Sequence, residues 1–231
     1  MEQRKCAVVT GASSGIGREI ARMLSLEGYD VAGIGRNFTE SDTSFRRISL
    51  DLLDEKALGN VIREIKASGT VKGLVNAAGV AYYGLHEDVP EAHIREIARV
   101  NLEIPMILAS AFLPMIRENK GFIVNISSVT AAGPSPHAAA YGATKAALSH
   151  FSDTLFAEER KHGIRVINVE PDLTETKLYR NADFTTSADE DARLVPGDVA
   201  AAVRDALSSR SGVCIRSIRL SPQKNKIERL K

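Results

Sequence analysis

The fold of this chain is decided by the stretch Thr10-Gly11-Ala12-Ser13-Ser14-Gly15-Ile16-Gly17. An apolar run, Cys6–Val9, precedes it and is typical of a buried parallel strand, and an amphipathic helical pattern begins inside it. A glycine-rich turn between a strand and a helix lets backbone N–H groups and the positive end of the helix approach a phosphate. The stretch therefore predicts a nucleotide site near the start of the chain.

The spacing of the three glycines narrows the kind of nucleotide site. The pattern Gly-x-x-x-Gly-x-Gly is one residue longer at the front than the dinucleotide fingerprint Gly-x-Gly-x-x-Gly. It lacks the lysine of the phosphate loop Gly-x-x-x-x-Gly-Lys, which disfavours a kinase or an NTPase. An ordinary tight turn is the alternative, and the position between a strand and a helix favours the nucleotide site over it.

Length and charge bound the class of protein. The chain has 231 residues and no shift in composition or Pro/Ser-rich linker, so we expect a single dinucleotide-binding domain over 1–231. Lys plus Arg total 30 against 29 for Asp plus Glu, and the net charge of +1 gives no general attraction to nucleic acid or anionic lipid. No stretch approaches the roughly 20 apolar residues of a membrane span, and the N-terminus has no signal-peptide pattern. We therefore expect a cytoplasmic protein with no nucleic-acid or membrane partner.

Disulfide and metal chemistry have little support. The two cysteines, Cys6 in the first expected strand and Cys214 in the last, form no disulfide framework in a chain of this size and are expected to be buried thiols. The histidines show no Cys/His/carboxylate spacing typical of zinc sites, so no metal is predicted. His137 lies closest to the chemistry described below, and a helix start or a surface position is the favoured interpretation for it.

The second expected strand, Asp30–Gly35, carries the cofactor preference. In a dinucleotide fold the tip of this strand reaches the adenosine ribose, where a carboxylate would accept bonds from the free 2′-hydroxyl of NAD. Gly35 stands in the place of that carboxylate, and Arg36 follows it. Arginine forms charge-assisted, often bidentate bonds to phosphate, so the sequence predicts NADP(H) over NAD(H). A solvated loop arginine is the alternative.

Strands and helices alternate along the rest of the chain. The first helix ends near Gly28; further strands are expected at Arg47–Asp51, Val71–Asn76, Gly121–Ser128, Arg165–Glu170 and Val213–Leu220, and further helices at Asp54–Ala67, Glu91–Ile116, His137–Lys161 and from Pro196. The alternation predicts an α/β fold with a doubly wound, parallel, seven-stranded sheet and helices on both faces, which is Rossmann-like. Pro105 should bend the long helix near Asn101 because proline removes a backbone bond.

Three connections are irregular. Only ten residues, 37–46, separate Arg36 from the next strand, which predicts a short loop with one turn of helix. The polar stretch from Pro171 to Leu194 has no period and predicts a substrate lid. The tail Gln223–Lys231 is expected to be frayed. At the end of the third strand, Asp51-Leu52 could contact the adenine, or Asp51 could cap the following helix.

A phenol and an ammonium occur four residues apart in Tyr141-Gly142-Ala143-Thr144-Lys145, on one face of an expected helix. Ser128, thirteen residues earlier, lies at a strand end, where its hydroxyl could bond a carbonyl oxygen. A phenol with a pKa of about 10 is a poor acid–base catalyst at neutral pH, and a nearby ammonium lowers that pKa. Such a trio could donate a proton to a carbonyl while a hydride arrives from a nicotinamide, or run the reverse. Alone, the Tyr/Lys pair could be an ordinary exposed contact.

The motifs follow one another as Thr10-Gly11-x-x-x-Gly15-x-Gly17, Asn76-Ala77-Ala78-Gly79, Asn101, Ser128, Tyr141-x-x-x-Lys145 and Pro171 with Thr176. As a set, and over nearly the whole chain, they resemble the classical short-chain dehydrogenase/reductase family. One departure is Pro171-Asp172, where the family usually has Pro-Gly. The turn beside the nicotinamide is therefore expected to differ, with Asp172 facing either solvent or a substrate.

The resemblance implies a role for each motif. Tyr141 would be the catalytic acid/base, Ser128 would orient or polarise the substrate oxygen, and Lys145 would bond the nicotinamide ribose and lower the tyrosine pKa. Asn101 would hold a water that links Lys145 to solvent. The implied cofactor-binding residues are Gly11, Ser13, Ser14, Gly15, Ile16, Gly17, Arg36, Asp51, Leu52, Asn76, Ala77, Ala78, Gly79, Tyr141, Lys145, Pro171, Thr174 and Thr176.

The implied activity is that of an NADP(H)-dependent oxidoreductase that interconverts a carbonyl and a secondary alcohol. Its small-molecule substrate would be a 3-hydroxy acid or a 3-oxoacyl compound, and a homodimer or homotetramer would be built on the two long helices. The alternative from another class is a non-catalytic NADP(H)-binding redox sensor or regulatory protein. Such a protein is expected to lack part of the Ser/Tyr/Lys set, which is complete here.

Several residues near the expected site keep two interpretations. Tyr82, Tyr83 and Leu85 follow the Asn76 turn and either wall the pocket or simply pack. Lys177, Arg180 and Arg193 lie in the lid stretch and either bind a substrate carboxylate or form a solvated face.

Overall fold

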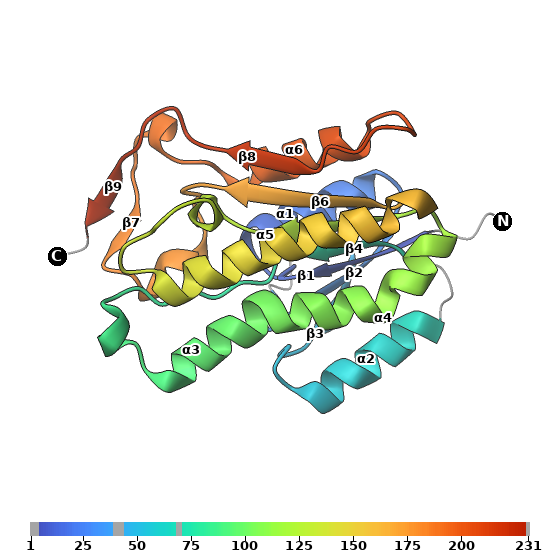
Figure 1. Ribbon diagram of the computed structural model, residues 1–231, viewed down its shortest axis with the longest axis horizontal. Helices are drawn as coiled ribbons and strands as arrows, with labels where there is room; N and C mark the ends of the chain where they lie inside the picture. Colours follow the sequence, from blue (N-terminus) through green and yellow to red (C-terminus); the bar gives the residue numbers. More distant parts are fainter. Residues whose placement is uncertain (1–4, 39–43, 68–70, 230–231) are drawn as a thin grey trace.

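The fold is described from a computed structural model that covers residues 5–38, 44–67 and 71–229. Its main sheet has seven parallel strands in the order β3-β2-β1-β4-β5-β6-β8 (Figure 1). Their bounds are β1 Cys6–Thr10, β2 Asp30–Gly35, β3 Arg46–Ser49, β4 Val71–Asn76, β5 Phe122–Ile126, β6 Arg165–Pro171 and β8 Ser217–Leu220. The doubly wound, seven-stranded parallel sheet is therefore confirmed. Its strand order reverses between β1 and β4, which is where such sheets open a crevice for ligands.

Helices cover both faces of the sheet (Figure 1). The residues of α1 Gly15–Leu26 and α6 Pro196–Leu207 share one apolar cluster with one face. Those of α2 Glu55–Ala67, α4 Ile104–Glu118 and α5 Ala139–Glu159 share a second cluster with the other face. All five residues of β1 are buried, as an apolar run sandwiched between two helical layers requires.

The long helix expected over Glu91–Ile116 is interrupted near Asn101. It consists of α3 Glu91–Ala98, a π turn (η2) at Arg99–Glu103, and α4. Pro105 has no N–H to donate to the carbonyl of Asn101, four residues before it, so regular α-helical bonding fails there. The predicted disturbance is confirmed and takes the form of one widened turn.

The helical run Glu91–Glu118, 28 residues long, is apolar enough to cross a membrane by length and composition. This differs from the sequence expectation that no stretch approaches a membrane span. The core helix of a soluble protein passes the same test. Here α4 packs Ile104, Leu108 and Phe112 into the core cluster beneath the sheet.

The lid stretch and the tail contain structure that the sequence did not predict. Within the lid stretch lie η5 Lys177–Asn181, β7 Phe184–Thr186 and η6 Glu190–Ala192. The tail provides β9 Ile227–Arg229, which pairs with β7 in an antiparallel ladder at the carboxyl end of the main sheet (Figure 1). The Glu228 carboxylate accepts a 2.8 Å bond from the Ala188 N–H and a 3.2 Å bond from the Ser187 hydroxyl. The expectation of a frayed tail is therefore wrong for 223–229.

Other boundaries differ by a few residues. The strand that ends the main sheet begins at Ser217, so Cys214 lies before it; this thiol is half-buried, Cys6 is buried, and both are free. His137 precedes α5 with a positive φ of 65° instead of starting the helix. The remaining short helices are η1 His86–Asp88, η3 Val129–Ala131 and η4 Arg160–His162. The single helical turn expected between Arg36 and β3 falls on 39–43, outside the described residues.

Candidate active site

The glycine-rich turn is packed so tightly that side chains have no room. A Cβ on Gly17 would lie 2.5 Å from the carbonyl oxygen of Gly11, and a Cβ on Gly11, whose φ is +70°, would lie 2.8 Å from the Ala78 nitrogen. The Thr10 hydroxyl accepts 3.2 Å bonds from the N–H groups of Ala77 and Ala78. The turns after β1 and β4 are thereby held together at the point where the strand order reverses.

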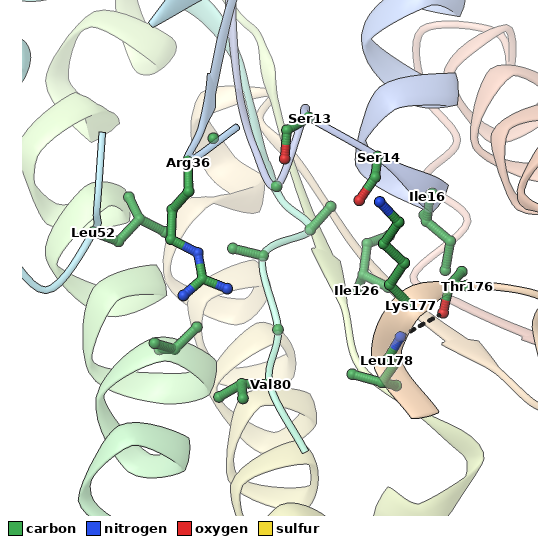
Figure 2. Close-up of a pocket in the computed structure, with 18 of the residues that line it drawn as sticks. Ser13, Ser14, Ile16, Arg36, Leu52, Val80, Ile126, Thr176, Lys177 and Leu178 are labelled. Atoms are coloured by element: carbon green, nitrogen blue, oxygen red, sulfur yellow. Dashed lines mark hydrogen bonds between the residues drawn. The ribbon is translucent and has the colours of Figure 1, made fainter. Parts of the chain in front are cut away.

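A pocket opens at this carboxyl edge of the sheet (Figure 2). Most of the predicted site residues line it together: Gly11, Ser13, Ser14, Gly15, Ile16, Gly17, Arg36, Asp51, Leu52, Ala77, Ala78, Gly79, Ser128, Tyr141, Lys145, Pro171, Thr174 and Thr176. Figure 2 shows Arg36 and Leu52 on one side of the pocket, and Ser14, Ile16 and Thr176 on the other. Residues far apart in the sequence thus share one cavity.

The turn after β3 excludes one of the two alternatives for Asp51, the helix cap, and leaves the adenine contact as a prediction. Asp54, not Asp51, caps α2, because its Oδ1 accepts a 2.9 Å bond from the Ala57 N–H. The Asp51 carboxylate accepts a 3.0 Å bond from the Leu53 N–H and lines the pocket.

Two predicted site residues, Asn76 and Asn101, lie behind the pocket instead of lining it. The Asn76 amide donates a 2.8 Å bond to the Asn125 side chain on the neighbouring strand. The Asn101 side chain accepts from the Val80 N–H and donates to the Val80 carbonyl oxygen, both at 2.9 Å. Both amides are buried. The two bonds of Asn101 hold Val80, which lines the pocket. The roles expected of Asn76 at the cofactor and of Asn101 in a water relay stay predictions.

Ser128, Tyr141 and Lys145 lie close together in the lining of the pocket. Tyr141 lies in the first turn of α5, and the Lys145 Nζ one turn later is 5.6 Å from the centroid of its ring. That Nζ donates a 2.8 Å bond to the Ile126 carbonyl oxygen. The Ser128 hydroxyl accepts from the Thr130 N–H at 3.2 Å and is hydrogen-bonded to the phenol of Tyr141. A hydroxyl, a phenol and an ammonium therefore converge, as the sequence predicted.

Burial controls the protonation of this trio. It raises the pKa of Tyr141 above the ordinary value, and the nearby Tyr179 raises it further, whereas the Ser128 hydrogen bond lowers it. Burial also lowers the pKa of Lys145 to about 8. The sequence led us to expect Lys145 to lower the tyrosine pKa, but the net shift in this structure is upward. Removal from water disfavours the phenolate more than the neighbouring groups favour it.

An aromatic wall, formed by Tyr83, Tyr179 and Phe184, stands beside Tyr141. The Tyr83 ring centroid lies 6.4 Å from that of Tyr141, 6.2 Å from that of Tyr179 and 5.1 Å from that of Phe184. Of these three rings only Tyr179 lines the pocket with Tyr141, whereas Tyr83 packs against Tyr141 and lines a second pocket. Tyr82 turns away, stacks on His93 at 3.7 Å and donates a 2.7 Å bond to Glu96.

The lid contributes lining residues that sequence reasoning did not assign to the cofactor: Asp172, Lys177, Leu178, Tyr179 and Arg180. Asp172 is half-buried, and its Oδ1 accepts a 2.8 Å bond from the Leu173 N–H. Val80, in the turn after β4, and Ile126, at the end of β5, were also missed, because an apolar residue carries no signal that separates a pocket wall from the core. Among residues 5–38, 44–67 and 71–229, no group of three or more His, Cys, Asp or Glu side chains could hold a metal ion.

Known proteins match this chain over most of its length. The family model for short chain dehydrogenases matches residues 5–186. An uncharacterized oxidoreductase of Staphylococcus epidermidis is 29% identical over 229 residues, which cover 95% of this chain and 98% of the relative. The alcohol dehydrogenase of the archaeon Thermococcus sibiricus, solved with 5-hydroxy-NADP, has a TM-score of 0.84 and 25% identity, covering 96% of this chain and 99% of that one.

A second solved structure, the 3-ketoacyl-(acyl-carrier-protein) reductase of Brucella melitensis, was obtained in complex with NADH. It has a TM-score of 0.80 and 25% identity, and the match covers 94% of this chain and 96% of that one. Relatives with this fold therefore include proteins solved with either kind of nicotinamide cofactor. Matching motifs, sheet order and family model agree, and the chain belongs to the short-chain dehydrogenase family of oxidoreductases.

Proposed function

We propose that this protein is an NADP(H)-dependent oxidoreductase that interconverts a carbonyl and a secondary alcohol, with Tyr141 as its acid/base. The observation that carries the proposal is the convergence of Ser128, Tyr141 and Lys145 in the same pocket that the glycine-rich turn lines. The residues fit a dinucleotide, because Gly11, Gly15 and Gly17 line the pocket at the N-terminus of α1, where backbone N–H groups can bind a phosphate. The family relationship supports the reaction class.

The preference for NADP(H) is supported by the charge at the tip of β2. Arg36 lines the pocket on the side of Leu52, and Gly35 offers no carboxylate to accept bonds from a free 2′-hydroxyl. Guanidinium binds phosphate through charge-assisted bonds. A 2′-phosphate therefore adds affinity at this position, whereas NAD(H) gains little from it.

The side chains of Tyr141, Ser128 and Lys145 handle the proton of the reaction, and the nicotinamide, when bound, supplies or accepts the hydride. The Tyr141 phenol, kept neutral by burial, donates its proton to the carbonyl oxygen, and the Ser128 hydroxyl donates a hydrogen bond to the same oxygen. The Lys145 ammonium, 5.6 Å from the ring, stabilises the phenolate that forms. Carbonyl reduction starts from the protonated phenol, which is the form that the raised pKa of Tyr141 maintains at neutral pH, whereas alcohol oxidation requires the phenolate.

The substrate belongs among 3-hydroxy acids and 3-oxoacyl compounds, and the aromatic wall favours the second group. Tyr179 lines the pocket with Tyr141, and Tyr83 and Phe184 pack against Tyr179, so this side of the site is apolar and suits an acyl chain better than a small charged acid.

Copies of the chain are proposed to associate through α4 and α5, because Met106 and Ile107 on α4 are exposed apolar side chains. Light scattering of the wild type and of Ile107→Lys tests this association.

The function is tested by the absorbance of the reduced cofactor in the presence of 3-oxoacyl thioesters, 3-hydroxy acids, sugars and steroid-like ketones, with NADP(H) and NAD(H) in parallel. Tyr141→Phe should abolish turnover while keeping the affinity for NADPH within a few-fold. Tyr29→Phe, the same chemical change far from the pocket beside Phe122, is the matched control and should keep full activity. NADPH binding without turnover on any substrate would favour the redox-sensor alternative.

A further inference from the structure

Four cationic side chains line the cofactor pocket, and three of them are accounted for. Lys145 is buried and bonded to the Ile126 carbonyl oxygen, and Arg36 lies at the tip of β2. Arg180 donates a 2.9 Å bond to the carbonyl oxygen of Lys177. The fourth is Lys177 itself, whose ammonium makes no hydrogen bond or ion pair with any residue in the described ranges. Its charge is therefore available to a ligand.

Lys177 is held directly above the glycine-rich turn. The preceding residue, Thr176, packs on that turn, since a Cβ on Gly15 would lie only 3.2 Å from the Thr176 methyl group. Figure 2 shows the Lys177 side chain extending from the lid toward the hydroxyl of Ser14. Ser14 is the N-cap residue of α1, but its side chain makes no capping bond. An ammonium and an uncommitted hydroxyl thus face the same part of the pocket.

The turn itself provides hydrogen-bond donors but no positive side chain. Residues 11–17 contain no lysine or arginine, and Arg18, the next residue, directs its Nε to the Glu19 carboxylate at 3.3 Å. A pyrophosphate carries two negative charges, which backbone N–H groups bind without neutralising. An ammonium that approaches from the lid supplies the missing charge.

We propose that Lys177 binds the pyrophosphate of the dinucleotide from the lid side, opposite the glycine-rich turn. The inference rests on the proposed dinucleotide function and extends it, because it assigns cofactor affinity to the lid. Tyr179, two residues further on, belongs to the aromatic wall beside Tyr141. Cofactor binding through Lys177 therefore also fixes one wall of the substrate site, and the cofactor should bind before the substrate.

Two fragments of the cofactor separate Lys177 from Arg36. ADP-ribose carries the pyrophosphate without a 2′-phosphate, and 2′-AMP carries the 2′-phosphate without a pyrophosphate. Calorimetry of Lys177→Met should show affinities for ADP-ribose, NADH and NADPH that are each about tenfold weaker, with 2′-AMP unchanged within about twofold. Arg36→Ala should weaken the binding of 2′-AMP and NADPH and leave ADP-ribose and NADH within about twofold of the wild type. Lys177→Arg, which keeps the charge, should bind ADP-ribose nearly as well as the wild type.

Lys161→Met is the matched control, because Lys161 is also exposed and lies beyond the far end of α5, away from Tyr141. This control removes the same charge from the molecule and should leave all four affinities unchanged. Wild-type affinity of Lys177→Met for ADP-ribose would overturn the assignment, and so would an equal loss for 2′-AMP, which would indicate a general charge effect. If the wild type binds neither NADPH nor NADH, the proposed function itself fails, which is a different result.

Discussion

Asn101→Ala tests whether the Asn101 side chain holds the pocket wall in place instead of taking part in the chemistry. The Asn101 side chain is fully buried, and its two polar atoms satisfy both the N–H and the carbonyl of Val80 at 2.9 Å. Val80 belongs to the pocket wall after β4. Alanine removes both partners at once and leaves two buried backbone groups without a hydrogen bond.

The size of the effect follows from those two groups. Each buried group left unpaired costs about 1–3 kcal/mol, so the free energy of unfolding should fall by about 2–6 kcal/mol. Water entering the vacated space would bring the loss toward the lower value. For a chain of this length, about 2–4 °C per kcal/mol gives a melting temperature lower by about 4–24 °C. The affinity for NADPH should fall as well, because the wall loses its anchor.

Thermal unfolding followed by circular dichroism measures the change. Asn60→Ala, at an exposed position of α2, is the matched control and should melt within about 2 °C of the wild type. If Asn101→Ala lost turnover yet melted with the wild type, the side chain would act on the chemistry alone, and the framework role would be refuted.

Three further predictions concern the pocket. Arg36→Ala should weaken NADPH by about 10- to 100-fold and NADH by far less, and equal losses would contradict the phosphate assignment. Gly17→Ala forces a Cβ to within 2.5 Å of the Gly11 oxygen, so we expect a loss of about 1–3 kcal/mol in unfolding experiments together with weaker NADPH binding. Lys145→Met should abolish turnover but raise the free energy of unfolding at pH 7 by about 2 kcal/mol. The gain arises because burial holds the pKa of Lys145 at about 8, against an ordinary 10.5, so the wild type folds at the cost of burying a charge. The loss of the hydrogen bond to the Ile126 carbonyl offsets part of this gain. Between about pH 8 and 10.5, Lys145 is protonated in the unfolded wild type but not in the folded one, so the stability of the wild type rises with pH. The stability advantage of Lys145→Met should therefore shrink across this range. A difference in free energy of unfolding between variant and wild type that stays constant with pH would contradict the lowered pKa.

The main sheet could be predicted because its signals are local. Buried strands such as β1 read as short apolar runs, and amphipathic helices separate them at regular intervals. The interruption at Asn101 was predictable for the same reason, since Pro105 acts on a carbonyl four residues away. Motifs at strand ends gather at one edge of a parallel sheet without further information, so most of the pocket followed from the strand order.

The pairing of β7 with β9 could not be predicted from local patterns. Each strand has three residues, and Phe184 pairs with Arg229 across a long separation in sequence. Such short strands have no period to recognise, and the contact exists only after the main sheet brings both segments to its carboxyl end. The position of Tyr179 within the aromatic wall depends on the same arrangement.

The pKa of Tyr141 could not be predicted from local sequence patterns either. A lysine one helical turn away is visible in the sequence and predicts a lowered pKa. The opposing contribution is desolvation, which depends on everything that covers the phenol, including Tyr179 from the lid. The sign of the shift was therefore wrong, because the sequence contains the charged neighbour but not the burial.

The family motifs contain both residues that line the pocket and residues that support its wall, and the hydrogen bonds of the folded chain distinguish the two. Asn76 and Asn125 lie opposite each other on β4 and β5, and Asn125 lies opposite Asn168 on β6, so amides occupy one level across three strands at the edge below the pocket. The bond from Asn76 to Asn125 and the two bonds from Asn101 to Val80 direct these side chains into the interior, although the Asn76 Oδ1 has no hydrogen-bond partner in the described residues. The motif side chains with polar groups that line the pocket are instead Ser128, Tyr141, Lys145 and Thr176. Sequence motifs alone do not show which of the two positions a polar residue takes, because the hydrogen bonds form only in the folded chain.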